Sequence, residues 1–331
     1  MLQSRIARAN PAAIAVLALL AVLLVWTASR DDVTEYGAAL LTSVPWTASA
    51  AVLLLFALVA VHYLSAAIAL RAVSGQRTPL GSTLLVQFAA AATNRIVPSG
   101  VGAASVNLRY LLRGGMTLGA ATSSLAALGV VGGVTDLVYG AAVTAAGPMV
   151  GLDGATAELH GLAAHGLRAG QQHYGVLLLV AMVVLAVFMV RNRGSLRTSL
   201  VASSRQAGGH ARRLVGHRRR VASASAASVL TTVMMSVGFV VAVNVWGHSA
   251  TPLPAGALIA IYLFASAAGG TLPLPPILGT TEIALVSALV IGGYTSASAI
   301  EAVLIFRAIS YWLPLPIGAW AARRLRRDQL L

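Results

Sequence analysis

The chain has 331 residues, of which 58% are hydrophobic and only 10% are charged, and its mean hydropathy is +0.83. A soluble domain of this composition would expose apolar surface that it could not cover, so the composition favours a protein embedded in lipid. The net charge of +14 does not indicate nucleic-acid binding, because the arginines lie in short segments between apolar stretches rather than on one basic face. The sequence has no cysteine, which excludes disulfides and thiol chemistry.

Six apolar stretches each match the roughly 20 residues that a helix needs to cross about 30 Å of hydrocarbon. They are residues 12–28, 48–70, 118–146, 174–190, 222–246 and 299–320. Two further apolar stretches, 81–113 and 255–293, are interrupted by proline and glycine. The sequence therefore predicts an all-α integral membrane protein, a single membrane domain over residues 1–331, with about six full transmembrane helices and two broken, re-entrant helical hairpins.

The positions of the basic residues predict the orientation, because cytoplasmic loops collect them. With the N-terminus in the cytoplasm, 18 of the 23 arginines fall on the cytoplasmic side, two (Arg30 and Arg168) fall outside, and three lie at membrane depth. The segment 191–221 holds nine arginines and no acid, and we expect a cytoplasmic loop that attracts anionic lipid headgroups. The expected location is the plasma membrane of a bacterium, the inner membrane, with multiple passes and both termini in the cytoplasm.

The two broken stretches resemble each other at an offset of 178 residues. Each has a proline, then two glycines starting 16 residues later, then a threonine: Pro98, Gly114, Gly115 and Thr117 in one copy, and Pro276, Gly292, Gly293 and Thr295 in the other. The predicted topology gives the copies, about 81–146 and 255–322, opposite orientations. Inverted repeats with broken helices are a recurring plan of transporters, which bind substrate where the breaks meet. The alternative is that general richness in glycine and alanine produced two similar hairpins.

Backbone groups freed at the breaks by Pro98 and Pro276 cannot face lipid, so they must be buried in protein or line a wet cavity. A helix that begins just after such a break directs its amides and its positive dipole end into that space. This arrangement favours an anionic group such as a phosphate.

Three arginines lie at membrane depth, where an ionised side chain costs about 2.5 to 3.5 kcal/mol. Arg95, three residues before Pro98, is expected either to bind a headgroup or to tether carbonyls freed at the break. Arg109 lies four residues before Arg113, so its alternative is to extend to the cytoplasmic surface. Arg307 is too deep for that, and its alternative is an ion pair with an acid.

Three acids are the candidate charge partners or coupling groups. Asp136 lies among small residues where helices can approach closely, and we expect it to pair with an arginine rather than to carry protons freely. Glu282 and Glu301 fall near predicted helix starts, where a carboxylate stabilises the helix dipole. The sequence has no cluster with metal-ligand spacing and no nucleophile with an evident base, so we expect no catalytic residues, no metal and no cofactor.

Three runs resemble a known family: NRIVPSGVGAASVNLRYLL from Asn94, LPPILGTTEIALVSAL from Leu274 and FRAISYWLPLPIG from Phe306. They are similar to the transmembrane, flippase-like domain of lysylphosphatidylglycerol synthases, the multiple peptide resistance factors, over about residues 10–322. The resemblance implies a domain that binds and translocates phospholipids, here in a stand-alone form without the soluble synthase domain. By motif position it implies a role for Asn94, Pro98, Gly100, Gly102, Arg109, Gly279, Glu282, Arg307, Tyr311, Trp312 and Pro314.

One departure from the family pattern concerns the glycines that let a headgroup approach the backbone. The usual proline followed by two glycines is replaced by Pro98-Ser99-Gly100 in the first copy and by Pro276-Ile277-Leu278 in the second. Close approach of a headgroup is therefore less assured in the second copy.

The sequence as a whole predicts a non-enzymatic, lipid-binding translocase for a phospholipid or another amphiphile with an anionic phosphate headgroup. The phosphate is expected near Arg95, Arg109 and Arg307, with Asn94, Gly100, Gly102 and Gly279 around it and Pro276 at the second break. Asp136 and Glu282 would balance the arginines in the empty state. The alternatives are a transporter of polyprenyl-phosphate-linked sugar and a membrane scaffold for a separate lipid-modifying enzyme. The expected partners are anionic membrane lipids and no nucleic acid, with a homo-oligomer or an enzyme partner left open.

Overall fold

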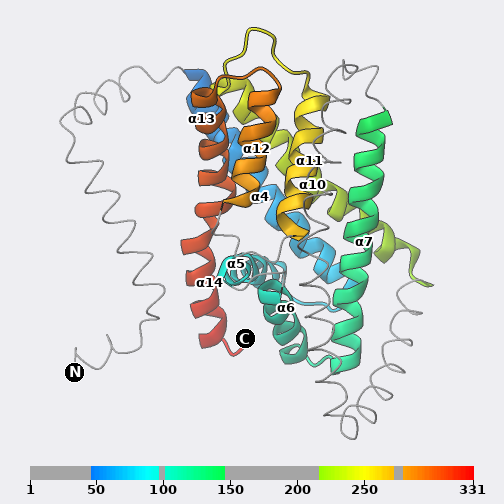
Figure 1. The fold of residues 1–331 in the computed structure, drawn as a ribbon. Helices are drawn as coiled ribbons and strands as arrows, with labels where there is room; N and C mark the ends of the chain where they lie inside the picture. Colours follow the sequence, from blue (N-terminus) through cyan, green and yellow to red (C-terminus); the bar gives the residue numbers. More distant parts are fainter. Residues whose placement is uncertain (1–45, 97–100, 146–215, 272–278) are drawn as a thin grey trace, which may run out of the picture. The chain divides into compact units, whose positions relative to one another are not determined.

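The computed structural model describes residues 46–96, 101–145, 216–271 and 279–331 (Figure 1). The chain divides into two compact units, residues 1–50 and residues 51–331. In the first unit only the opening turn of one helix, from Trp46, is described, so the fold below is that of the second unit.

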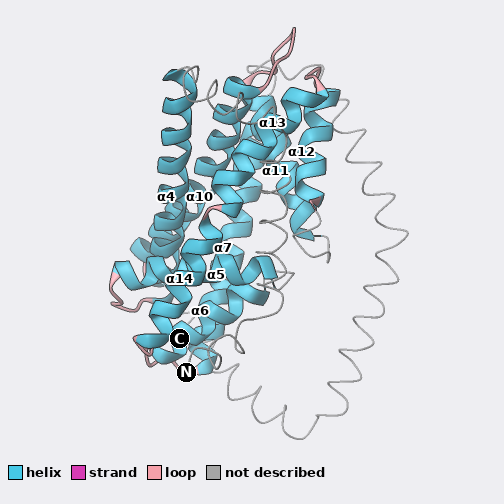
Figure 2. Ribbon diagram, turned by 90° about the vertical axis from the view of Figure 1, so that its left-hand side faces the viewer, coloured by secondary structure: helices cyan, strands magenta, loops and turns pink. Residues whose placement is uncertain are grey.

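The described residues are helical, with short loops and one isolated β-bridge between Ser249 and Tyr294 (Figure 2). The helices in chain order are α4 (Trp46–Ser74), α5 (Leu80–Ile96), α6 (Val101–Arg113), α7 (Leu118–Ala145), α10 (Arg218–Trp246), α11 (Ala255–Thr271), α12 (Thr280–Ile291), α13 (Ser296–Arg307), the π-helical η3 (Ala308–Trp312) and α14 (Pro314–Arg327).

Four helical segments of the described chain are long and apolar enough to cross a membrane. They are Trp46–Ser74, Leu118–Val143, Arg218–Trp246 and Ser296–Arg327, the last running through α13, η3 and α14. Each coincides with one of the six stretches expected from the sequence. The other two expected stretches, 12–28 and 174–190, lie outside the described residues.

The first broken stretch forms two antiparallel helices. Hydrogen bonds join their side chains in antiparallel order: Thr83 Oγ1 lies 3.1 Å from Tyr110 Oη, and Gln87 Nε2 donates to Asn107 Oδ1 at 3.1 Å. At 17 and 13 residues, α5 and α6 are each shorter than a full crossing. The second stretch gives α11 and α12, of 17 and 12 residues, which also pack against each other. Entry and return on one side of the membrane stays a prediction.

The two Gly-Gly turns that follow α6 and α12 have the same geometry. Gly115 and Gly293 both have φ of +87°, a left-handed conformation that favours glycine. In each turn the next amide donates to the carbonyl five residues earlier, Met116 to Leu111 at 3.1 Å and Tyr294 to Leu289 at 3.0 Å, as in a Schellman motif. Thr117 and Thr295 then cap the following helices, each accepting a hydrogen bond of 3.4 Å from the backbone amide three residues on. The 178-residue offset found in the sequence therefore has a counterpart in local structure.

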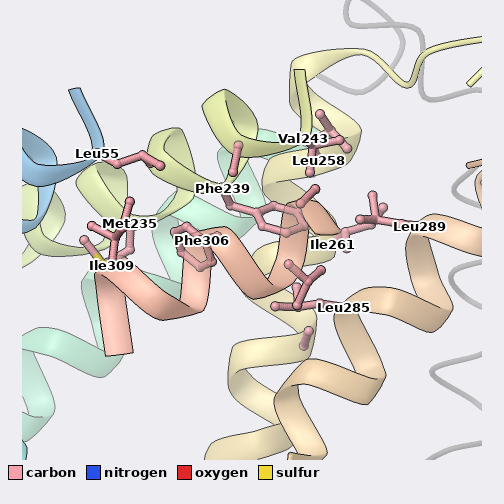
Figure 3. Close-up of a cluster of buried hydrophobic side chains, with 14 of the residues drawn as sticks. Leu55, Met235, Phe239, Val243, Leu258, Ile261, Leu285, Leu289, Phe306 and Ile309 are labelled. Carbon is pink, nitrogen blue, oxygen red and sulfur yellow. The ribbon is translucent and has the colours of Figure 1, made fainter. Parts of the chain in front are cut away.

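Two apolar clusters hold the described helices together. In the first, Phe239 of α10 meets Phe306 of α13 edge to face with ring centroids 5.6 Å apart, among side chains from α4, α11 and α12 (Figure 3). The second cluster joins α5, α6 and α14, with Val86 and Leu325 fully buried. Close van der Waals packing of this kind is what holds helices together in a membrane.

Close packing of α14 on α5 fixes the position of the candidate site. A Cβ atom at Gly318 of α14 would overlap the backbone carbonyl of Phe88 in α5, so a glycine is needed at this contact. The C-terminal turn of α5 also reaches η3, where the Arg95 side chain donates a hydrogen bond to the carbonyl of Ser310. Arg95 belongs to that turn of α5.

Candidate functional site

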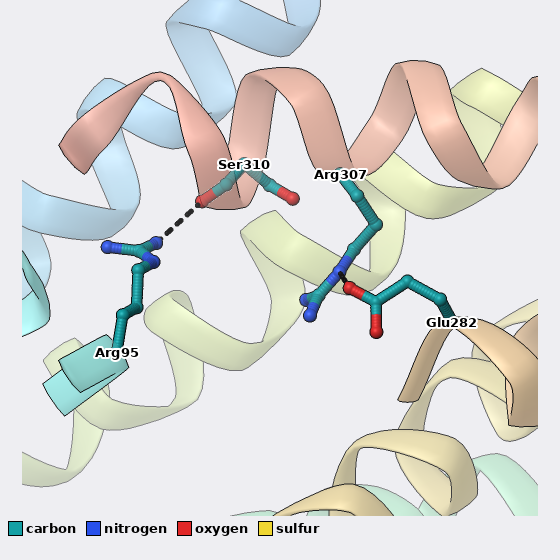
Figure 4. A network of polar contacts seen from close by, with 4 residues as sticks. All are labelled: Arg95, Glu282, Arg307 and Ser310. Carbon is teal, nitrogen blue, oxygen red and sulfur yellow. Dashed lines mark hydrogen bonds and ion pairs between the residues drawn. The ribbon is translucent and has the colours of Figure 1, made fainter. Parts of the chain in front are cut away.

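An ion pair joins the second broken stretch to the last membrane-spanning segment. Arg307, at the end of α13, places Nε 2.5 Å from Oε1 of Glu282 in the first turn of α12 (Figure 4). The two side chains are only 15% and 20% exposed. Glu282 is therefore the acid that pairs with Arg307, and its position at the start of α12 also suits the positive end of the helix dipole.

Gly279 sets the direction in which α12 begins. It is the residue before the helix and has φ of +70°, while its carbonyl accepts from the amide of Ile283 at 2.8 Å. A residue with a Cβ would be strained in this conformation. Gly279 thus acts through the backbone, by orienting the turn that carries Glu282.

Arg95 approaches the same region from the first broken stretch. It is 8% exposed, and its Nη2 donates to the backbone carbonyl of Ser310 at 3.4 Å (Figure 4). Pro314, four residues after Ser310, has no N–H to donate to that carbonyl. The chain is π-helical at this point, and Leu313 N donates to the carbonyl of Ala308 at 2.9 Å. A π-helical turn within an α-helix is frequent at functional sites.

Tyr311 stands between the two arginines in the contact network. The guanidinium carbons of Arg95 and Arg307 both lie 4.3 Å from the centroid of its ring. A cation over an aromatic face is stabilised by about 0.5 to 2 kcal/mol, the larger values applying where water is excluded. Trp312 packs edge-on against Tyr311, with ring centroids 5.4 Å apart. One aromatic ring therefore holds two like charges from distant parts of the chain in one cluster, which we call the Arg95–Arg307 cluster.

The Arg95–Arg307 cluster is rich in buried polar atoms that lack a well-formed hydrogen bond. In the described part of the chain, five of seven side-chain atoms without a well-formed hydrogen bond belong to it: Arg95 Nε and Nη1, Glu282 Oε2, Ser310 Oγ and Tyr311 Oη. Arg95 keeps looser contacts with the hydroxyl groups of Tyr63 and Tyr311. Buried polar groups in proteins are nearly always paired, and each unpaired one costs about 1 to 3 kcal/mol. The cluster thus has free hydrogen-bonding capacity, mostly of donors, and one positive charge more than Glu282 can balance.

Asn94 and Gly102 connect the two sides of the first break. Asn94 Oδ1 accepts a hydrogen bond from the amide of Ala103 at 3.5 Å, so it caps the first turn of α6. A Cβ at Gly102 would lie 2.6 Å from the carbonyl oxygen of Thr93, so glycine is needed where α6 starts against α5. Both residues support the backbone around the break, and the hydrogen bonds of Asn94, Arg95 and Arg307 in the described structure do not join Asn94 to either arginine side chain.

Three other predicted site residues lie apart from the cluster. Arg109 is exposed on α6 and has no contact with Arg95 or Arg307 in the described structure. Asp136, exposed on α7, accepts a hydrogen bond of 2.5 Å from Thr232 Oγ1 of α10 rather than pairing with a described arginine. Glu301 is exposed on α13. Pro98, Gly100 and Pro276 lie outside the described residues.

The sequence analysis did not single out Ser310, whose carbonyl accepts from Arg95. A signal for it existed, because a proline inside a helix always deprives the carbonyl four residues earlier of its usual donor. Among the residues that the structure describes, no three histidine, aspartate or glutamate side chains lie close enough together to hold a metal ion.

The long apolar helices, the two broken pairs and the polar cluster between them define a helical integral membrane protein. The sequence matches the family described as the lysylphosphatidylglycerol synthase TM region over residues 13–318, and the chain therefore belongs to that family. A comparison with curated proteins gives no match.

Proposed function

We propose that the protein is a lipid-binding translocase that carries a phospholipid, or another amphiphile with an anionic phosphate headgroup, across the membrane. The observation that carries the proposal is the Arg95–Arg307 cluster, where two arginines face one acid and five buried polar atoms of Arg95, Glu282, Ser310 and Tyr311 lack a well-formed hydrogen bond. Membership of a family of lipid-synthase membrane regions supports a role connected with membrane lipids.

The chemistry of the cluster fits a phosphate diester. Such a headgroup has one negative charge and oxygen atoms that accept hydrogen bonds, whereas Arg95 Nε and Nη1, Ser310 Oγ and Tyr311 Oη can all donate. Arginine binds phosphate through its planar fork of donors, and the interaction is strong where water is excluded. A bound phosphate would supply both the missing acceptors and the missing negative charge.

Glu282 takes the place of the lipid phosphate as the partner of Arg307 when no lipid is bound. In the empty state its carboxylate occupies Arg307 and lowers the cost of keeping that charge in the membrane. An arriving phosphate competes with Glu282 for the guanidinium and gains Arg95 as a second partner. Binding and release of the lipid are then coupled to the breaking and re-forming of one ion pair.

The broken helices provide the means of movement. Residues 97–100 and 272–278 separate the paired helices, and Arg95 and Glu282 lie close in sequence to these two breaks. In transporters built from inverted repeats, two such elements open in turn to opposite sides around a fixed site. The equal geometry of the turns at Gly115 and Gly293 supports a shared origin for the two halves.

The proposal is tested with full-length protein in liposomes that contain a fluorescent phosphatidylglycerol. A membrane-impermeant quencher reports how fast the labelled lipid changes leaflet. We expect Arg95→Gln and Arg307→Gln to slow the exchange by about tenfold or more, since each loses charged hydrogen bonds worth about 1.5 to 3 kcal/mol. Arg323→Gln, which removes an exposed charge from α14, is the matched control and should exchange lipid at the wild-type rate.

Two results would count against translocation. Lipid exchange no faster than in protein-free liposomes would remove the transport function and favour a scaffold for a separate lipid-modifying enzyme. Equal rates in the wild type and both cluster variants would mean that the arginines have no part in moving the headgroup.

A further inference from the structure

A second group of arginines surrounds an open cavity of about 290 Å³ at the C-terminal end of α4. The cavity is lined by the last turns of α4, by the link from Gly75 to Arg77 and by the first turns of α10. Three arginines line it: Arg71, which is half-buried, and Arg77 and Arg220, which are exposed. We call this site the α4–α10 pocket.

The backbone around Gly75 is shaped to hold one of these guanidiniums. Gly75 has φ of +67°, and its amide donates to the carbonyl of Arg71 at 2.9 Å, which ends α4. A Cβ at Gly75 would overlap Nη1 of Arg220, so the end of this side chain would have to move away from the turn. The next residue, Gln76, is fixed by a hydrogen bond of 3.0 Å from its Nε2 to the carbonyl of Gly114.

No described acid balances the three charges. Asp136 bonds to Thr232, Glu282 pairs with Arg307, Asp328 pairs with Arg324, and Glu301 lies on α13, so none of these four lines the pocket. Nε of Arg71 and Oε1 of Gln76 are moreover buried without a hydrogen-bond partner in the described structure, the only such atoms there outside the Arg95–Arg307 cluster. The negative end of the α4 dipole stabilises cations here, but its partial charge of about −0.5 cannot offset three of them.

We infer that the α4–α10 pocket binds a phosphate-type oxyanion, and that the oxyanion is the headgroup of an anionic membrane lipid. The cavity of about 290 Å³ is many times larger than the roughly 10 to 15 Å³ that one water molecule requires, which leaves room for a phosphate group and its adjoining alcohol. Ile68 and Ala72 give the lining an apolar side next to the arginines, as suits a phosphate that is attached to carbon. The pocket also lies at the end of a membrane-spanning helix, the depth at which lipid phosphates and juxtamembrane arginines meet.

This site is separate from the one used in the proposed translocation, and its binding does not depend on transport. The link between them is α5, which begins at Leu80, just after the pocket, and ends at the turn that carries Arg95. The 15 helical steps from Leu80 to Arg95 cover about 22 Å at 1.5 Å per residue. A lipid bound in the α4–α10 pocket would therefore lie at one end of α5, and the other end of α5 carries Arg95 of the proposed transport site.

The experiment is native mass spectrometry of the full-length protein in detergent, titrated with short-chain phosphatidic acid, with phosphatidylcholine and with inorganic phosphate. The test variant replaces Arg71, Arg77 and Arg220 by glutamine. The matched control replaces three exposed arginines of α14 by glutamine, Arg323, Arg326 and Arg327, and so loses the same charge. We expect the test variant to lose one bound phosphatidic acid, or to bind it about tenfold more weakly, while the control binds as the wild type does.

Further variants make the outcome specific to the pocket. Gly75→Ala keeps every charge but forces Arg220 away, and it too should weaken this binding event. Arg95→Gln combined with Arg307→Gln should leave it unchanged, which separates failure of this inference from failure of the proposed translocation. Thermal unfolding of each variant shows whether it is folded.

The titrations also distinguish the source of the oxyanion. Displacement of phosphatidic acid by millimolar inorganic phosphate would assign the pocket to free phosphate instead of a lipid. Equal lipid binding by the wild type, the test variant and Gly75→Ala would overturn the inference.

Discussion

Arg95 donates a hydrogen bond to the backbone carbonyl of Ser310, 215 residues further along the chain. This contact joins the C-terminal end of α5 to the π-helical turn η3 in the last membrane-spanning segment. It exists because Pro314 leaves the Ser310 carbonyl without its usual helical donor. A charged side chain at membrane depth is thus tied to a backbone group that the helix itself cannot satisfy.

Pro314→Ala tests this relationship directly. The substitution supplies an N–H four residues after Ser310, which would compete with Arg95 for the carbonyl. We expect higher thermal stability in detergent, because a proline within a helix costs up to about 3 kcal/mol, together with slower lipid exchange. Pro316→Ala is the control, since the carbonyl four residues before it belongs to Trp312 and receives nothing from Arg95. Slower exchange in both variants to the same extent would contradict the role given to Ser310.

The ion pair between Arg307 and Glu282 yields a second prediction. Arg307→Leu alone leaves a buried carboxylate without a partner, and we expect a loss of about 3 to 5 kcal/mol in stability. Arg307→Leu combined with Glu282→Leu removes both charges and should restore folding, measured by thermal unfolding, without restoring lipid exchange. Recovery of exchange in the double variant would show that Arg307 serves only to neutralise Glu282.

Two substitutions separate the role of the Tyr311 ring from the role of its hydroxyl. Tyr311→Phe keeps the ring that contacts both guanidiniums and removes a buried hydroxyl without a well-formed hydrogen bond, so the protein should be at least as stable as the wild type. It should lose only the hydrogen bond from the hydroxyl to a headgroup. Tyr311→Leu removes the cation–π contacts and should lower stability by about 1 to 2 kcal/mol. Chemical unfolding in detergent gives the stability, and lipid binding by mass spectrometry gives the affinity. Equal stability of the two variants would mean that the ring does not hold the arginines.

The matching turns predict matching effects of substitution. Gly115→Ala and Gly293→Ala each place a Cβ at φ of +87° and should each destabilise the protein by about 1 to 2 kcal/mol. The surroundings do not interfere, because a Cβ at Gly115 has no neighbour within 4 Å and one at Gly293 has none closer than 3.6 Å. Gly129→Ala, inside α7 and also without a close neighbour, should be neutral or stabilising. Unequal losses at Gly115 and Gly293 would argue against equivalent roles for the two turns.

The opposite orientation of the two breaks is open to a labelling test. The chain has no native cysteine, so single cysteines at Ser99 and Leu278 can be treated with a membrane-impermeant thiol reagent. We expect each to react from a different side of the membrane in sealed vesicles. Reaction of both from the same side would rule out the inverted arrangement.

The sequence predicted the helical class, the family and four of the spans because these depend on local apolar length and on ordered motifs. It also singled out Arg95, Arg307 and Glu282 as charged residues in apolar stretches, and Tyr311 by its motif position in the family resemblance. What it could not supply was their pairing. Whether Arg307 would meet Asp136 or Glu282 depends on how α7, α12 and α13 pack, and no spacing within one helix determines that.

Arg109 is a residue that the sequence placed at the headgroup site but that the structure does not bring to the Arg95–Arg307 cluster. Its motif position placed it beside the headgroup, but α6 carries it about 12 Å from the start of the helix at 1.5 Å per residue, away from the break. The three arginines expected around the headgroup are therefore reduced to two, Arg95 and Arg307, which both contact the ring of Tyr311. The role of backbone geometry at Asn94, Gly102 and Gly279 likewise required three-dimensional contacts.

The contact of Gly318 with α5 also restricts the number of residues between η3 and that glycine. An α-helix turns about 100° with each residue, so removal of one residue between Leu313 and Ile317, after the π-helical turn, would rotate the rest of α14 by that amount. Gly318 would then leave its contact with Phe88, and a side chain would be driven into the backbone of α5. Natural variation in this segment should consequently consist of replacements, with insertions and deletions excluded.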